Sequence, residues 1–205
     1  MILGAAKIAE LLDRGREPAS PDPLVITPTP DLAQLRASEA ASVDLRPGTW
    51  FSSMKQARLS VTRTSQENTA ARITRTYFIP FGQEFILHPM SFVLAATLEW
   101  IRLPLDLAAY VVGKSSWGRC GLIIATATGV HPGFYGCLTL ELSNVGEIPI
   151  AVKPGYPIGQ LFIHRVETGG SAVGHKSHFG GSRRPMFRPI NLDPFADRLA
   201  GASRV

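Results

Sequence analysis

Residues 114–144 read KSSWGRCGLIIATATGVHPGFYGCLTLELSN and include the strand around which the fold is organised. From Leu138 to Ser143 apolar and polar residues alternate, and strand side chains point to opposite faces with a period of two. The three leucines therefore share one face, while Thr139, Glu141 and Ser143 share the other. We expect a half-buried β-strand on which Glu141 is an acid within a polar stripe.

The start of the same stretch is a basic, hydroxyl-rich turn. It places the side chains of Lys114, Ser115, Ser116 and Arg119 close together, and the neighbouring glycines allow a ligand to approach the backbone closely. Such a turn is able to bind an anion such as phosphate. The alternative is a solvated loop that binds nothing.

Short β-favouring runs recur from Tyr77 to Leu161, with Gly or Pro between them. This spacing is typical of an all-β barrel or sandwich. Upstream, the apolar spacing of Ile2–Leu12 predicts a short amphipathic helix that ends near Arg14, and Asp31–Ala41 predicts a second helix with Asp31 as its N-cap. Leu24–Thr27 is a candidate edge strand. The chain is thus expected to be mainly β with few helices.

Composition is that of a globular protein with one domain. The chain has 205 residues, of which 45% are hydrophobic and 18% charged. No run of apolar residues is long enough to span a membrane, and the first ten residues lack a basic leader, so we expect a cytoplasmic protein that does not bind membranes. The net charge of +5 comes from scattered cations, and we expect no nucleic-acid binding.

The two cysteines, Cys120 and Cys137, are too few for a disulfide framework and have no metal-ligand spacing. We expect both to be small buried hydrophobes. Zinc-dependent nucleobase deaminases carry an H-x-E motif and a P-C-x-x-C motif, and neither occurs in this sequence. The sequence therefore argues against a zinc-dependent enzyme of that class.

A second acid, Asp44, lies between the apolar residues Val43 and Leu45. It has two interpretations. As a structural residue it would lie in the interior, with backbone N–H groups satisfying the carboxylate. As a catalytic residue it would face the site. We favour the structural interpretation.

Taken together and in this order, several motifs resemble those of the dCTP deaminases, which belong to the dUTPase-like superfamily. The motifs are ASVDLR at 41–46, FVLAATLEW at 92–100, LPLDLAA at 103–109, the turn at 114–119, HPGFYG at 131–136, LTLELSN at 138–144 and PGYPIGQL at 154–161. The resemblance covers about residues 38–166. It implies a β-clip, dUTPase-like distorted barrel over residues 1–167 and a flexible tail at 168–205 that closes over the site.

The resemblance also implies roles for individual residues. Glu141 would be the general base and acid, Ser115 would hold the attacking water, and Arg119 would stabilise charge beside Glu141. The implied substrate-binding residues are Lys114, Ser116, Thr128, Val130, His131, Gly133, Phe134, Phe179 and Arg183. An alternative for Arg119 and Glu141 is a structural ion pair.

The chain departs from the family at three places, one of which is a turn between Gly121 and Pro132 that is one residue shorter than in the enterobacterial type of deaminase. His131 stands where dUTPases, and many of the deaminases, carry an Asp that in dUTPases orients the water attacking phosphorus, which argues against pyrophosphatase activity. In the tail, Phe179 would replace a stacking Tyr, and Arg183 would replace a phosphate-binding cation. The family's tail Gln has no counterpart here.

The function implied by the resemblance is zinc-independent deamination of dCTP to dUTP and ammonia. Mg²⁺ would arrive bound to the triphosphate, with no metal ligands from the chain. The family builds each site between the subunits of a homotrimer. Two alternatives stay open: a bifunctional deaminase and pyrophosphatase that forms dUMP, and a non-catalytic, nucleotide-binding regulatory trimer.

Overall fold

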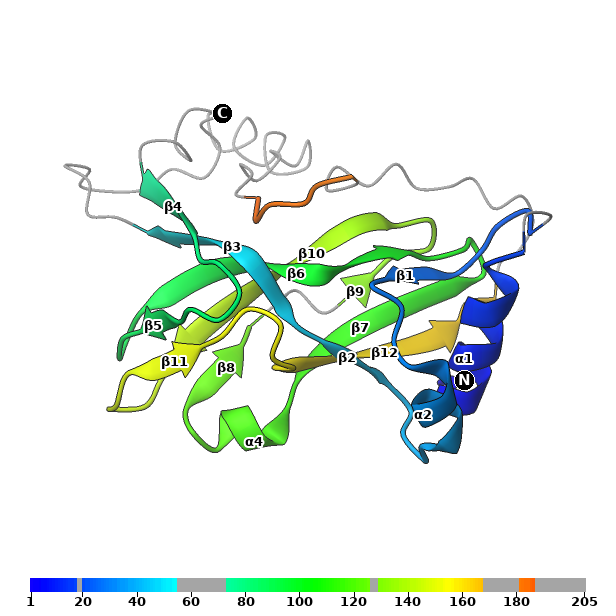
Figure 1. Ribbon diagram of the computed structural model, residues 1–205, viewed down its shortest axis with the longest axis horizontal. Coiled ribbons are helices and arrows are strands. Elements are labelled where there is room, and N and C mark those ends of the chain that lie inside the picture. The colour runs from blue at the N-terminus through cyan, green and yellow to red at the C-terminus, as the bar shows by residue number, and fades with distance from the viewer. Residues whose placement is uncertain (18–19, 55–72, 126–128, 168–180, 187–205) are drawn as a thin grey trace, which may run out of the picture.

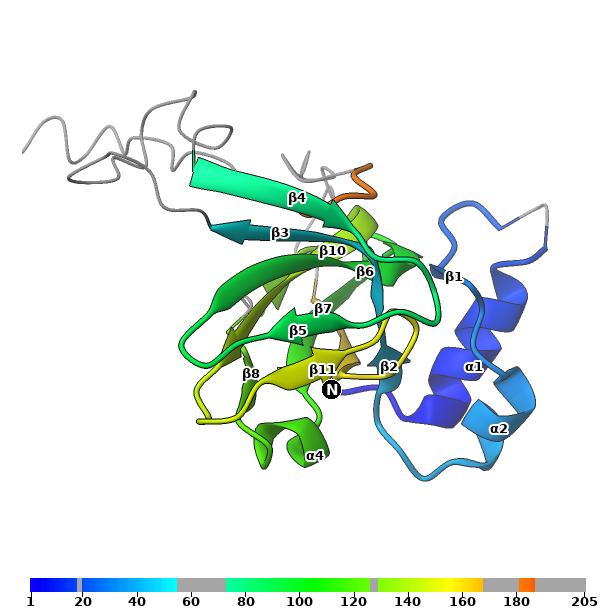
Figure 2. The ribbon, with the colours of Figure 1, turned by 60° about the vertical axis from the view of Figure 1, so that its left-hand side comes forward.

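Most of the regular secondary structure consists of β-strands, as Figures 1 and 2 show. The computed structural model describes residues 1–17, 20–54, 73–125, 129–167 and 181–186. The helices are α1 (Ala5–Arg14), α2 (Leu32–Ala37) and α4 (Ser115–Gly118). The strands are β1 (Val25–Thr27), β2 (Val43–Leu45), β3 (Pro47–Met54), β4 (Thr74–Phe78), β5 (Phe85–Leu87), β6 (Phe92–Arg102), β7 (Leu107–Gly113), β8 (Leu122–Ile124), β9 (Gly129–Val130), β10 (Tyr135–Asn144), β11 (Ile150–Val152) and β12 (Gly159–Arg165). The predicted mainly β fold with a short N-terminal helix is confirmed.

The strands form three sheets. The largest has the order β4-β3-β6-β10-β8, and β1 also pairs with β6. A second sheet has the order β2-β12-β7-β9, and β11 pairs with β5 in a third. All of the pairs are antiparallel. Figure 1 shows the first two sheets as layers around a shared core, a distorted barrel rather than a flat sandwich.

The alternation predicted for 138–143 is present in β10. Leu138, Leu140 and Leu142 are buried in the core, and the residues between them are half-buried. The leucines face the second sheet because β7 and β12 contribute apolar side chains to the same core. The opposite face of β10, which we call the outer face, carries Thr139 and Glu141.

The N-terminal helices pack on each other at one end of the molecule, as Figure 2 shows. Helix α1 begins three residues later than predicted and buries one apolar face, including Ile8 and Leu12. Asp31 caps α2 as expected, because its carboxylate accepts hydrogen bonds from the backbone N–H groups of Ala33 and Gln34. Strand β1 is the predicted edge strand, paired with β6.

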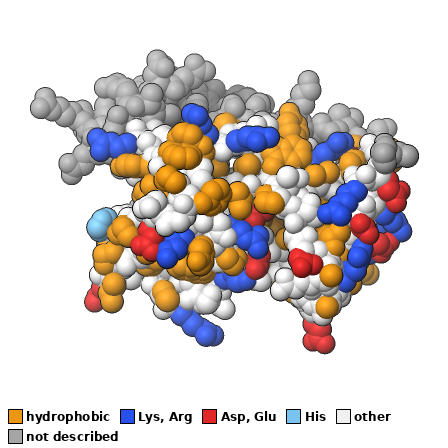
Figure 3. All heavy atoms as spheres, in the orientation of Figure 1, with side chains coloured by type: hydrophobic (Ala, Val, Ile, Leu, Met, Phe, Trp, Pro, Cys, Tyr) orange, Lys and Arg blue, Asp and Glu red, His pale blue; other side chains and the backbone are white. Residues whose placement is uncertain are grey.

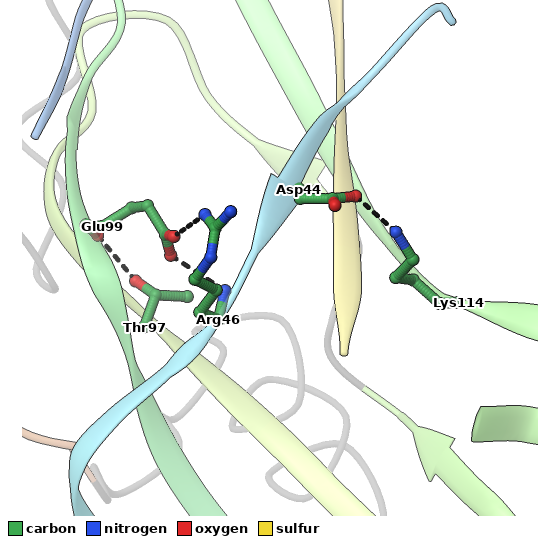
Figure 4. A network of polar contacts seen from close by, with 5 residues as sticks. All are labelled: Asp44, Arg46, Thr97, Glu99 and Lys114. Atoms are coloured by element: carbon green, nitrogen blue, oxygen red, sulfur yellow. Dashed lines mark hydrogen bonds and ion pairs between the residues drawn. The ribbon is translucent and has the colours of Figure 1, made fainter. Parts of the chain in front are cut away.

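A buried acid supports the irregular pairing of β6 with β10. The register shifts between Cys137 and Thr139, and the Thr97 hydroxyl fills the interrupted ladder by accepting a hydrogen bond from Leu138 N. Thr97 in turn donates to the carbonyl oxygen of Glu99. The Glu99 side chain is 1% exposed, and its carboxylate oxygens lie 2.9 Å from Arg46 Nη1 and 3.0 Å from Arg46 N (Figure 4).

The expectation about the cysteines is wrong. Cys120 is exposed and Cys137 is half-buried, so the two are not both buried hydrophobes; both are free thiols. Residues 130–136 connect two sheets, because β9 pairs with β7 whereas β10 pairs with β6 and β8. The chain crosses between two sheets here, since Val130 and Phe134 are drawn into the core between them.

None of the helices in the described part of the chain is sufficiently long and apolar to cross a membrane.

Candidate functional site

Glu141 lies on the outer face of β10, opposite Leu94 of β6. Its backbone carbonyl accepts a hydrogen bond of 2.8 Å from Ala125 N, which ties the strand to the segment after β8. Partial burial raises the pKa of the Glu141 carboxyl above its usual range, because the charged form loses contact with water. A carboxyl with a raised pKa is suited to accept and return a proton near neutral pH.

The basic turn is a single helical turn, α4, preceded by Lys114. Ser115, Ser116 and Arg119 are all exposed, so their side chains are available to a ligand. The Arg119 guanidinium forms no hydrogen bond or ion pair with any residue that the structure describes. The alternative of a structural ion pair between Arg119 and Glu141 within one chain therefore has no support.

Lys114 makes an ion pair that corrects the prediction for Asp44. Lys114 Nζ lies 2.7 Å from Asp44 Oδ1, and their side chains are 28% and 35% exposed (Figure 4). The expectation of an interior Asp44 satisfied by backbone donors is wrong. The reason lies in the sheet: Asp44 stands in the edge strand β2, with its side chain directed away from the core that receives Val43 and Leu45.

In one chain, the turn and Glu141 lie toward the same end of β10. Leu122, at the start of β8, pairs with Asn144, so α4 lies beyond the C-terminal end of β10. Glu141 is three residues before Asn144, about 10 Å back along that strand. Figure 1 shows α4 at the edge of the molecule, below the sheet that carries β10.

The predicted base- and sugar-binding residues have mixed placements. Val130 and Phe134 are 6% and 7% exposed, so their side chains are packed in the core. His131 is exposed. Gly133 has a φ of 75°, a left-handed conformation that favours glycine in this turn. Thr128 lies outside the described residues.

Part of the tail runs along β10. Gly181 N donates to the Tyr135 carbonyl at 2.8 Å, and Cys137 N donates to the Ser182 carbonyl at 2.9 Å. Arg183 is exposed and lies at the wall of a cavity of about 370 Å³ between this segment, β3 and β6. Phe179 and most of 168–205 lie outside the described residues, so the predicted closure of the tail stays a prediction.

The charges around these elements are dispersed. On the face shown in Figure 3, Lys and Arg side chains are interspersed with acidic and apolar side chains rather than gathered in one block. Among the residues that the structure describes, no group of three His, Cys, Asp or Glu side chains is arranged to hold a metal ion.

Two contributors to the site were not identified from sequence. The Arg46–Glu99 pair supports the β6 bulge beside β10, and the signal for it was an acid inside the apolar run of β6. Trp117 is the half-buried residue of α4, and its indole Nε1 donates to the Pro157 carbonyl at 2.9 Å. The available signal in the sequence was a single Trp within an otherwise polar and glycine-containing turn, which indicates a residue that anchors the turn.

Comparison with known proteins places these features in a family context. Residues 2–166 match the family model described as dCTP deaminase-like. The chain is 38% identical over 168 residues to a dCTP deaminase, dUMP-forming, of Methanobrevibacter smithii, covering 82% of this chain and 81% of that protein. It is 40% identical over 162 residues to a dCTP deaminase of Natronomonas pharaonis, covering 78% of each.

A solved structure shares the fold. The 2'-deoxycytidine 5'-triphosphate deaminase from Agrobacterium tumefaciens superposes with a TM-score of 0.58 and 22% identity over 81% of this chain. The chain spans about half of that structure, 48% of its length.

Proposed function

Because the chain belongs to the dCTP deaminase-like family, we propose that it deaminates dCTP hydrolytically to dUTP and ammonia, without zinc. The observation that carries this proposal is the environment of Glu141, a partly buried carboxyl with a raised pKa on the outer face of β10. The absence of both zinc-deaminase motifs from the sequence supports a mechanism in which a carboxylate, rather than a metal, activates water.

In this mechanism Glu141 takes a proton from a water molecule held by Ser115 as the water oxygen bonds to C4 of cytosine. The proton passes to N3, which gives a tetrahedral intermediate. A second proton transfer through Glu141 makes the exocyclic amine a leaving group, and the C4–N4 bond breaks to release ammonia. A positioned general base and acid contributes roughly 10²–10⁴ in rate. Arg119 would stabilise the negative charge that develops beside Glu141.

Lys114 and Ser116 would bind the triphosphate, with Mg²⁺ carried on the phosphate oxygens. The Lys114–Asp44 ion pair bears on this role, since the same ammonium that meets Asp44 would turn toward a phosphate oxygen. Arg183 of the tail would supply a second cation. Backbone groups near Gly133, and the exposed His131, would contact the sugar.

The site is proposed to form between subunits of a homotrimer. The support is that, among the residues that the structure describes, the Arg119 guanidinium forms no hydrogen bond or ion pair, and therefore none with Glu141. A neighbouring subunit that brings its Arg119 and Ser115 to Glu141 would complete the site. Two inactive variants test this directly: co-expressed Arg119→Ala and Glu141→Gln chains should recover about one quarter of wild-type activity in mixed trimers. No recovery would show that the two residues act within one chain.

The activity itself is tested by incubating the protein with Mg²⁺ and dCTP, and with dUTP in parallel, while nucleotides, ammonia and pyrophosphate are resolved over time. Ammonia and dUTP from dCTP, without pyrophosphate, are the expected products. Glu141→Gln should abolish turnover and leave nucleotide affinity within about threefold, whereas Glu147→Gln, on the exposed loop after β10, serves as the matched control. Near-normal turnover by Glu141→Gln would overturn the mechanism.

A second candidate is the bifunctional reaction that ends at dUMP. It is favoured by the relative from Methanobrevibacter smithii, which is named dUMP-forming. Pyrophosphate release in the same assay would identify it. Nucleotide binding without any turnover would identify the regulatory trimer. A cytoplasmic location stays a prediction from the sequence.

A further inference from the structure

Among the described residues, Trp117 is the side chain of helix α4 that packs against the body of the protein. It has only four residues, and Lys114 at its N-cap makes no side-chain cap hydrogen bond. A helix this short is not stable by itself in water. From Ser115 to Cys120 each residue is exposed except Trp117, which is half-buried and packs against the core.

Trp117 holds α4 by packing and by a hydrogen bond. Its indole Nε1 donates to the Pro157 carbonyl at 2.9 Å, immediately before β12. Lys114, the residue that precedes α4, is attached separately, because its backbone N–H donates to the Ile158 carbonyl at 2.9 Å. The front of the turn is therefore fixed through the backbone, and the rest of it through the Trp117 side chain.

We propose that Trp117 is a positioning residue that sets the directions of Ser115 and Arg119, and this rests on the function proposed above. Helical turns connect these residues rigidly, since Gly118 N donates to the Lys114 carbonyl and Arg119 N to the Ser115 carbonyl. A displacement of the Trp117 backbone therefore moves Ser115 and Arg119 together. Small displacements of catalytic groups reduce rate strongly, because transition-state contacts depend on geometry.

The two attachments predict which kinetic constant changes. Lys114 keeps its backbone bond to Ile158 when Trp117 is altered, so its charge stays at the phosphate site while Ser116 moves with the turn. KM should therefore change less than kcat. Ser115 and Arg119 act on the transition state, so kcat should fall. Trp117→Phe keeps an aromatic ring and removes only the indole N–H, and we expect a kcat lower by about 3–10-fold with KM within about twofold. Trp117→Ala should lower kcat by about 10².

A purely structural role is separated from a positioning role by a double-mutant cycle. If Trp117 acts through Arg119, the kcat loss of Trp117→Phe should shrink in an Arg119→Lys background, because the guanidinium that it orients is already gone. Tyr110→Phe removes a polar aromatic atom from β7, in the other sheet, and should leave kcat unchanged. Unchanged kcat in Trp117→Phe, or losses that multiply fully with Arg119→Lys, would overturn the proposal.

Failure of the proposed function would be recognised separately, as an absence of ammonia with wild-type protein. The attachment is then measured without activity, by hydrogen exchange of the amides of Arg119, Cys120 and Gly121, which all bond within the turn. Trp117→Phe should speed their exchange by about fivefold or more relative to wild type. Equal exchange rates in the two proteins would overturn the role of Trp117 in holding the turn.

Discussion

The Arg46–Glu99 ion pair offers a quantitative test of how the β6 bulge is held. Arg46→Met removes the guanidinium that lies 2.9 Å from Glu99 Oε1, while the backbone bond from residue 46 to Oε2 is retained. Breaking a buried pair typically costs about 3–5 kcal/mol because a charge is left uncompensated. Arg46 is itself 34% exposed and one donor to Glu99 remains, so we expect a smaller loss of about 2–3 kcal/mol in the free energy of unfolding.

The loss should depend on pH in a defined direction. Burial already raises the pKa of Glu99 in the folded protein, with Arg46 opposing that rise. Removing Arg46 raises the pKa further. A carboxyl whose folded pKa lies above its unfolded value contributes stability at low pH that is lost as pH rises through the folded pKa. The deficit of the Arg46→Met variant should therefore be largest at pH 8 and smaller at pH 5.

Urea unfolding of wild type and variant at both pH values, at one protein concentration, measures this deficit. At pH 8 a thermal midpoint lower by roughly 5–10 °C should accompany it. Arg165→Met is the matched control, because the Arg165–Asp106 pair at 3.3 Å is 54% exposed on both sides and should contribute less than about 1 kcal/mol. Equal deficits at the two pH values, or a deficit no larger than that of the control, would refute the reasoning.

Three further predictions concern the site and its support. The acidic limb of the kcat/KM profile should lie above the ordinary Glu pKa of 4.5, because burial raises the pKa of Glu141 and the base must be ionised; a limb at 4.5 or below in a pH–rate measurement would contradict this. Lys114→Met should raise the KM for dCTP by about 10-fold and leave kcat within about threefold in steady-state kinetics, and an unchanged KM would remove Lys114 from the phosphate site. Gly121→Ala should lower the free energy of unfolding, measured by urea titration, by roughly 2 kcal/mol or more, because Gly121 has a φ of 92° and an added Cβ would meet Gly146 N at 2.8 Å. A neutral substitution would show that this loop adjusts freely.

Local pattern was sufficient for much of the fold. The alternation in β10 identified both the core leucines and the face that bears Glu141, because strand periodicity is a property of the backbone. The Asp31 cap was equally local, since its partners are two and three residues away. Glu141, Ser115 and Arg119 were identified because their spacing along the chain matches a family.

Pairing across long sequence separations was decided only by the tertiary structure. Asp44 pairs with Lys114, which is 70 residues away in the sequence. This pairing, rather than contact with backbone donors, depends on the position of β2 at the edge of its sheet. The crossing of 130–136 between two sheets depended on where its apolar side chains found space. The hydrogen bond of Trp117 depends on the packing that brings the Pro157 carbonyl beside it. The sequence by itself predicted which residues would carry the chemistry. Packing determined which residues one chain brings together, because side-chain contacts between distant segments follow from how the sheets close on a shared core.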